Sequence, residues 1–459
     1  MRKLKAFLAS ITALSCLCAS CLPMAKQIPP IHSIVASAKI ATSGTCGENL
    51  TWSFEESTGT LTISGTGEME NWSYYKKSYW YDSNKDIKKI ILEDGVTTIG
   101  DEAFSGCTAL QTAIIPDSVT TIGINAFYGC TALQSIIIPD SVTSIEDYSF
   151  NNCHALESII IPNSVTSIGK FVFYHCDSLT SVTIPDSVTS IGSGTFDNTP
   201  WLEMKRNENP LVIVNGILID ATTCKQNEII IPDNVTTIGE DAFCLCEFLT
   251  SFIIPDSVTK IEESAFYHCD SLTSVTIPDG VTIIGSQAFV YCFSLASVTI
   301  PDSVTIIGSG AFNGCTALQS IIIPDSVTTI GERAFQDCVC LKYVSIENSE
   351  CEIYDYESTI SDTATIYGYD NSTAQTYAGT YHRNFVSLGT APENPTTEIL
   401  TGDANKDGEF NILDIIVLQK WLLGSGNLSN WQAVDFNYDG IINIFDFVLG
   451  KKYYLRNLS

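Results

Sequence analysis

The sequence predicts a mainly β fold with short helical turns, built as a solenoid of 23-residue repeats and followed by a small all-α domain. Three observations lead to this prediction. Residues 93–346 repeat every 23 positions, each repeat contains one short alternating apolar run, and the last sixty residues hold two copies of one acidic loop. At 459 residues the chain is long enough for several domains and a large core.

Three residue types define the repeat. Proline recurs at Pro116, Pro139, Pro162, Pro185, Pro232, Pro255, Pro278, Pro301 and Pro324. Phenylalanine recurs at Phe104, Phe127, Phe150, Phe173, Phe196, Phe243, Phe266, Phe289, Phe312 and Phe335, and cysteine at Cys107, Cys130, Cys153, Cys176, Cys246, Cys269, Cys292, Cys315 and Cys338. Pro185 and Pro232 are 47 residues apart (232 − 185), or two periods plus one, so residues 199–231 are expected to form a divergent turn with an insertion.

Each repeat is expected to place one strand on a shared sheet. The run 179–184 alternates, so Leu179, Val182 and Ile184 should point inward, and the next proline ends the strand because it has no N–H to donate. The phenylalanine and cysteine that follow should be buried. Equivalent residues then stack from turn to turn at ~4.8 Å, which places them in ladders along one continuous core.

This pattern resembles the BspA-like leucine-rich repeat of bacterial surface proteins. The resemblance implies a β-rich N-terminal cap over residues 39–92 and a leucine-rich repeat solenoid with its closing cap over residues 93–388. Residues 389–401 contain Pro392 and Pro395 and are expected to be an extended linker.

The two acidic loops match at every position where a calcium loop needs oxygen. Side-chain oxygens fall at loop positions 1, 3, 5, 9 and 12, glycine stands at position 6, and the carbonyl at position 7 adds a ligand. The loops lie 32 residues apart, which a pair of ordinary solvated turns does not explain. The sequence therefore predicts two Ca²⁺ ions, bound by Asp403, Asn405, Asp407, Glu409, Asn411 and Asp414, and by Asp435, Asn437, Asp439, Ile441, Asn443 and Asp446.

Residues 402–455 resemble a type I dockerin, because aspartate replaces the usual glutamate at position 12 and no full helix precedes the first loop. The resemblance implies a dockerin domain over residues 402–459 that binds a cohesin module of a cellulosomal scaffoldin. The cohesin contacts it implies are Ile412, Leu413, Gln419 and Lys420 in the first copy, and Ile444, Phe445, Lys451 and Lys452 in the second. Because the two sets differ, both a single and a dual binding mode remain open. Gly450 departs from the apolar residue usual in this helix.

The N-terminus is expected to be an export signal over residues 1–38, since three basic residues precede the apolar run 6–22. Cleavage after the Ala36-Ser37-Ala38 motif or near residues 23–25 would both fit, and a membrane anchor is the alternative. The chain carries 23 basic and 52 acidic residues, a net charge of −29, and has no basic stripe. These features argue against nucleic-acid binding, and no later segment is long enough for a membrane span.

The seventeen cysteines invite a disulfide framework, but their ladder positions favour free thiols that fill the core. The pairs His175-Cys176 and His268-Cys269 suggest a cysteine nucleophile. The residue before the cysteine varies among repeats, so it is interpreted as a surface position. We find no recognisable catalytic motif.

The outward strand positions form two nearly uniform rows. One row contains Thr112, Ser135, Ser158, Ser181, Ser251, Ser274, Ser297 and Ser320, and the other Ile114, Ile137, Ile160, Thr183, Ile230, Ile253, Thr276, Thr299 and Ile322. They form either a weakly apolar binding strip or a plain scaffold. We expect a secreted, non-catalytic, cellulosome-associated protein whose solenoid binds a protein or cell-wall ligand. The alternatives are an accessory in plant polysaccharide catabolism that holds substrate or a partner enzyme, and a glycoside hydrolase or protease.

Overall fold

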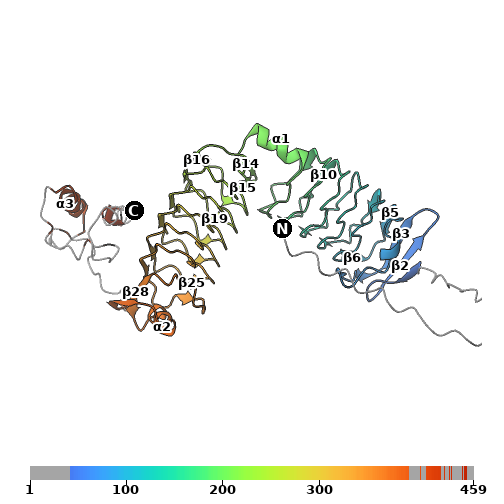
Figure 1. Ribbon diagram of the computed structural model, residues 1–459. Helices are drawn as coiled ribbons and strands as arrows, with labels where there is room; N and C mark the ends of the chain where they lie inside the picture. Colours follow the sequence, from blue (N-terminus) through green and yellow to red (C-terminus); the bar gives the residue numbers. More distant parts are fainter. Residues whose placement is uncertain are drawn as a thin grey trace, which may run out of the picture. The chain divides into compact units, whose positions relative to one another are not determined.

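The structure is a computed structural model, and it describes residues 42–391, 404, 410–424, 428, 434, 436, 447 and 449–451. Residues 42–391 form a solenoid in which parallel strands of successive repeats pair in register (Figure 1). In β10 and β12, for example, Ser158 pairs with Ser181, which is one 23-residue period later. The repeat spacing thus predicts the strand register correctly.

The first set of strands lies at the predicted alternating runs, except that residues 135–137 do not form a strand. The expectation of one shared sheet is wrong, because this set divides into five separate sheets. The set begins with an antiparallel cap that continues into parallel repeats. The strands are β1 (Ser43–Thr45), β2 (Leu50–Glu55), β3 (Thr60–Gly65), β5 (Lys89–Leu92), β7 (Thr112–Ile114), β10 (Ser158–Ile160), β12 (Ser181–Thr183), β16 (Glu228–Ile230), β18 (Ser251–Ile253), β20 (Ser274–Thr276), β22 (Ser297–Thr299), β24 (Ser320–Ile323), β26 (Tyr343–Ile346), β28 (Thr365–Asp370) and β29 (Phe385–Thr390).

A second set of short strands, which the sequence analysis does not predict, follows each proline turn. The first sheet of this set contains β4 (Gly67–Glu68), β6 (Val96–Ile99), β8 (Thr121–Ile122), β9 (Ser144–Ile145), β11 (Ser167–Ile168) and β13 (Ser190–Ile191). The second contains β14 (Val212–Val214), β15 (Ile217–Asp220), β17 (Thr237–Ile238), β19 (Lys260–Ile261), β21 (Ile283–Ile284), β23 (Ile306–Ile307), β25 (Thr329–Ile330) and β27 (Glu352–Ile353). Most of these strands have two residues, too few to show a period-two pattern.

The core consists of the predicted ladders. Phe127 and Phe150 stack with ring centroids 5.3 Å apart, and Phe266 and Phe289 with centroids 5.1 Å apart. Every ladder phenylalanine is buried, as is the leucine that follows each ladder cysteine. Because each ring packs between those of its neighbours, no turn buries its apolar face alone, and the array is stable only as a stack.

Hydroxyl groups link the turns outside the core. Ser118 Oγ donates a hydrogen bond to the carbonyl oxygen of Val96 at 2.7 Å, and Ser257 Oγ donates to that of Val235 at 2.7 Å. The threonine two residues after each of these serine positions donates in the same way; Thr305 Oγ1, for example, donates to the carbonyl oxygen of Thr282 at 3.1 Å. The hydroxyl groups of the Ser-Val-Thr segment that follows each proline thus donate hydrogen bonds to carbonyl oxygens of the preceding turn. This contact explains why the segment varies little from repeat to repeat.

The insertion after Phe196 forms helix α1 (Pro200–Glu208) and the β14–β15 hairpin. Thr199 caps the helix by accepting a hydrogen bond from Leu202 N at 3.1 Å, and proline occupies the first helical position. Arg206 at the end of α1 makes a bidentate ion pair with Asp220 of β15, with N–O distances of 2.9 and 2.8 Å. This ion pair fixes the helix to the hairpin.

Among the described residues, three other helices are short. The 3-10 turn η1 (Tyr81–Ser83) lies in the N-terminal region, α2 (Thr373–Thr380) packs on β28 near the end of the solenoid, and α3 (Ile412–Leu422) lies in the C-terminal region. No helix among the described residues is long and apolar enough to cross a membrane.

Candidate functional site

The start of α3 brings together two of the predicted calcium ligands. Asn411 is the N-cap, and its Oδ1 accepts a hydrogen bond from Leu413 N at 2.9 Å. Asp414 accepts one from Asn411 N at 2.8 Å and is only 1% exposed. Asparagine and aspartate supply the oxygen ligands that Ca²⁺ prefers.

The exposed residues of α3, apart from Trp421, share one face. With 100° between successive residues, the exposed positions Ile412, Leu413, Ile416, Gln419, Lys420 and Leu423 fall within an arc of about 120°. Ile412 is 47% and Leu413 54% exposed, whereas Leu418 is fully buried. Trp421 is exposed outside this arc. The four predicted cohesin contacts of the first copy therefore lie on one solvent-facing surface. We call this surface the α3 face, and it consists of Ile412, Leu413, Ile416, Gln419, Lys420 and Leu423.

The opposite side of α3 packs into a small core. Leu418 is buried with Ala404 and Val434, and Phe436 packs against this cluster. A Cβ added at Gly450 would lie within 2.4 Å of a Phe436 ring carbon, so this ring occupies the space that a side chain would need. That contact explains why glycine replaces the apolar residue expected there.

The other predicted site residues lie outside the described residues, apart from Lys451, which is exposed. These positions are Asp403, Asn405, Asp407, Glu409, Asp435, Asn437, Asp439, Ile441, Asn443 and Asp446 among the calcium ligands, and Ile444, Phe445 and Lys452 among the cohesin contacts. Their roles remain predictions.

The outward strand rows of the solenoid have the predicted orientation. Isoleucines 114, 137, 160, 230 and 253 are exposed, and Ile322 is half-buried. Exposed threonine interrupts the row at Thr183, Thr276 and Thr299. The apolar strip is therefore discontinuous along this face.

The ladder cysteines form a row of buried thiols, and every cysteine in residues 42–391 is free. Cys176 Sγ donates a hydrogen bond to the Phe150 carbonyl at 3.3 Å, and Cys338 Sγ to that of Phe312 at 3.1 Å. Burial raises the pKa of each of these two thiols to about 12. They therefore remain protonated at neutral pH and are poor nucleophiles.

The two histidines that precede ladder cysteines contact carboxylates instead of thiols. His175 Nδ1 lies 3.4 Å from Asp177 and His268 Nδ1 lies 3.2 Å from Asp270. Both histidines have positive φ, of 56°, at a turn position that glycine occupies in other repeats. This left-handed turn, and not a catalytic pair, accounts for their place beside the cysteine.

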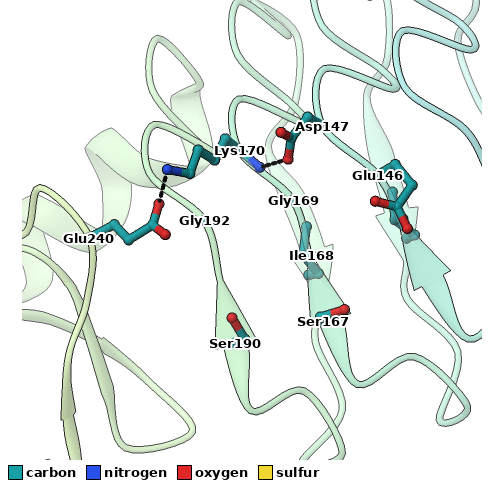
Figure 2. Close-up of a pocket in the computed structure, with 10 residues that line it drawn as sticks. Glu146, Asp147, Ser167, Ile168, Gly169, Lys170, Ser190, Gly192 and Glu240 are labelled. Carbon is teal, nitrogen blue, oxygen red and sulfur yellow. Dashed lines mark hydrogen bonds and ion pairs between the residues drawn. The ribbon is translucent and has the colours of Figure 1, made fainter. Parts of the chain in front are cut away.

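A shallow cavity of about 170 Å³ lies where β11 and β13 approach Glu240 (Figure 2). Lys170 Nζ lies 2.7 Å from a Glu263 oxygen and 3.2 Å from a Glu240 oxygen, and its backbone N–H donates to Asp147 at 2.7 Å. Burial lowers the pKa of Lys170, but its hydrogen bond to Glu263 and the charge of Glu240 outweigh this and raise it overall. Glu240 and Glu263 thus share one ammonium group, which links the turns before and after the insertion.

In-register parallel strands around stacked phenylalanines define a leucine-rich-repeat solenoid. The chain matches the BspA type leucine rich repeat region in six copies, over residues 76–203, 221–342 and 282–363, and the dockerin type I domain over residues 401–455. The chain therefore belongs to the BspA-type leucine-rich-repeat family and carries a C-terminal type I dockerin. A comparison with curated proteins found no match.

Several solved structures resemble the chain. A leucine-rich repeat protein from Eubacterium ventriosum is 24% identical, covers 78% of this chain and 98% of its own, and gives a TM-score of 0.44. A leucine rich cell surface protein from Faecalibacterium prausnitzii is 26% identical, with coverages of 70% and 96% and a TM-score of 0.36. A leucine-rich repeat protein from Bacteroides ovatus is 25% identical, with coverages of 74% and 99% and a TM-score of 0.32.

These families indicate calcium binding and a cohesin partner for the dockerin, an interaction surface for the repeats, and an extracellular or cell-surface protein. No enzyme domain was found. Sequence analysis missed Ile416 and Leu423 of the α3 face, although their helical spacing from Ile412 could have identified them. The exposed tyrosines of residues 74–81, at the start of the matched repeat segment, were not predicted either.

Proposed function

We propose that the chain is a secreted, non-catalytic component of a cellulosome-type assembly. In this proposal residues 1–38 direct export, residues 39–388 form the capped solenoid, residues 389–401 are a linker, and residues 402–459 form the dockerin. Two Ca²⁺ ions fold the dockerin, which then attaches the chain to a scaffoldin cohesin. The solenoid presents its surface to a protein or cell-wall partner.

The α3 face carries this proposal. It exposes aliphatic side chains beside Gln419 and Lys420, while Ile415 and Leu418 are buried on the other side of the helix. A solvent-facing aliphatic surface on a helix of this length is typical of a docking contact, since an isolated domain gains stability by burying such residues. Lys420 adds a positive charge that suits an acidic partner surface.

Capture on an immobilised type I cohesin tests the proposal. The full chain should bind in the presence of Ca²⁺ and be released by a chelator, because the clustered carboxylates of each loop repel one another without a cation. A quadruple variant replaces the two helix-start residues of each copy with alanine: Ile412→Ala, Leu413→Ala, Ile444→Ala and Phe445→Ala. It should weaken capture while leaving calcium-dependent folding intact.

The matched control is Ile114→Ala, which removes a solenoid isoleucine of similar exposure, 45% against 47% for Ile412, and should leave capture unchanged. If the wild-type chain bound the cohesin equally well with and without Ca²⁺, or if the quadruple variant kept full capture, the proposed docking role would be wrong.

A further inference from the structure

The N-terminal region presents a group of exposed tyrosines that the repeats do not explain. Tyr74 is 74% and Tyr75 94% exposed, and Tyr79 and Tyr81 are also exposed. Together with Lys76 and Lys77 they form what we call the tyrosine platform, residues 74–81. It follows the antiparallel cap in sequence and lies at the start of the segment that matches the leucine-rich repeat.

Buried tryptophans hold this platform in place. Trp80 is 1% exposed, donates from Nε1 to the Ala103 carbonyl at 2.8 Å, and stacks on Phe104 of the phenylalanine ladder with centroids 5.8 Å apart. Trp72 is also buried and meets Trp80 edge to face at 5.1 Å. The backbone that carries the exposed tyrosines is thus anchored to the solenoid core at Trp72 and Trp80.

Contacts among the exposed side chains fix their arrangement further. The Lys77 ammonium lies 4.7 Å from the Tyr74 ring centroid and 5.0 Å from that of Tyr81, so it holds the two rings on either side of it. Tyr74 meets Tyr75 edge to face at 5.2 Å. Glu70 accepts hydrogen bonds from Lys76 Nζ at 2.9 Å and from Tyr79 Oη at 3.2 Å.

The composition of the platform indicates the ligand. Within residues 70–86 the exposed side chains are Tyr, Ser, Lys, Asp and Asn, and none is aliphatic. The surface therefore offers aromatic rings set among hydrogen-bonding groups. A sugar ring presents an apolar C–H face and a rim of hydroxyls, which match an exposed phenol ring and the adjacent polar groups.

The net charge of residues 70–86 indicates whether the bound sugar is neutral or charged. Lys76, Lys77 and Lys85 carry three positive charges and Glu70, Asp82 and Asp86 three negative ones, so residues 70–86 have a net charge of zero in a chain of net charge −29. An anionic polymer would be repelled by the remainder of the chain. We propose that the tyrosine platform binds a neutral polysaccharide chain by stacking sugar rings on Tyr74 and Tyr75.

The proposal goes beyond docking and does not depend on the dockerin. Affinity electrophoresis of the full chain in soluble β-glucan, xylan and mannan, followed by calorimetry with cellohexaose or xylohexaose, measures it directly. At least one neutral glycan should retard the wild-type chain. The double variant Tyr74→Ala/Tyr75→Ala should bind it at least tenfold more weakly, and because both rings are exposed it should keep the wild-type circular dichroism.

Tyr354→Ala is the matched control, because it removes an exposed tyrosine far along the sequence and should bind as wild type does. A variant that lacks two calcium ligands of the first loop, Asp403→Ala/Asp414→Ala, should weaken cohesin capture but keep glycan binding, which separates this proposal from the docking role. The proposal is overturned if no neutral glycan binds, if binding is confined to polygalacturonate or to a protein, or if the double tyrosine variant binds undiminished.

Discussion

The ion pair between Arg206 and Asp220 should be a major stabilising contact of the insertion, and Arg206→Met tests this. The Asp220 side chain is 8% exposed, and Arg206 gives it two hydrogen bonds of 2.8 and 2.9 Å. In the variant this carboxylate would keep only the hydroxyl of Thr222, at 2.7 Å. Removal of one partner of a buried pair costs about 3–5 kcal/mol, and we expect about 3 kcal/mol because Thr222 remains.

Urea unfolding of the full chain, followed by far-UV circular dichroism, measures this loss. The neighbouring Lys205→Met is the matched control, since Lys205 pairs with Glu208 on the exposed side of α1 and should contribute less than about 1 kcal/mol. The double variant Arg206→Met/Asp220→Leu should recover most of the stability, because it removes the uncompensated charge. Equal effects of Arg206→Met and Lys205→Met would refute the reasoning.

Three further predictions concern pH, thiols and metal. Burial, together with the charges of Asp302 and Asp325, raises the pKa of Glu347 from 4.5 to about 7. The folded state therefore holds this proton more tightly than the unfolded state, and the stability that protonation confers is lost as pH rises from about 4.5 through 7. Unfolding experiments should show that Glu347→Gln has little effect at pH 4 but stabilises the chain at pH 8 by about 1–3 kcal/mol; an equal effect at both pH values would contradict this. Iodoacetamide should modify native protein at the exposed Cys340 first and the ladder cysteines only after unfolding, as mass spectrometry would show; extensive disulfides in the unreduced chain would disprove it. A chelator should leave the strand signal of circular dichroism almost unchanged, since no group of three or more potential metal ligands was found among the described residues, and a large loss of that signal would show that the solenoid needs metal.

The repeat allowed most of the solenoid to be predicted. One residue type at a fixed 23-residue spacing must occupy one structural position, so the phenylalanine and cysteine ladders and the strand register followed from counting. The second set of strands could not be found in this way, because two residues show no alternation. Those strands form through hydrogen bonds to neighbouring turns, as in the pairing of Ser144 with Ser167.

The cysteine position also has a role that the sequence does not reveal. We interpreted the residue as a small apolar filler, and the structure adds a hydrogen bond from each thiol in the ladder after Cys107 to a carbonyl of an earlier turn. The contact joins residues 25 or 26 positions apart, so it depends on how the turns stack. Alanine would fill part of the space but could not donate this bond.

The non-repetitive parts were the least predictable. Residues 199–231 were identified only as an insertion, although Thr199 and Pro200 form a helix-start signal that could have predicted α1. The tyrosine platform has no periodic signal, and its exposure depends on the burial of Trp72 and Trp80 beneath it. In the dockerin, the capping contact between Asn411 and Asp414 agrees with a helix that begins where the predicted calcium loop ends.

Calorimetric titration of the full chain with a type I cohesin, once in Ca²⁺ and once in chelator, tests the docking role most directly. In Ca²⁺ we predict a saturable isotherm with one cohesin per chain, and in chelator no heat of binding, because the α3 face depends on a folded dockerin. The same isotherm under both conditions, or no binding in Ca²⁺ to any type I cohesin tried, would contradict the account.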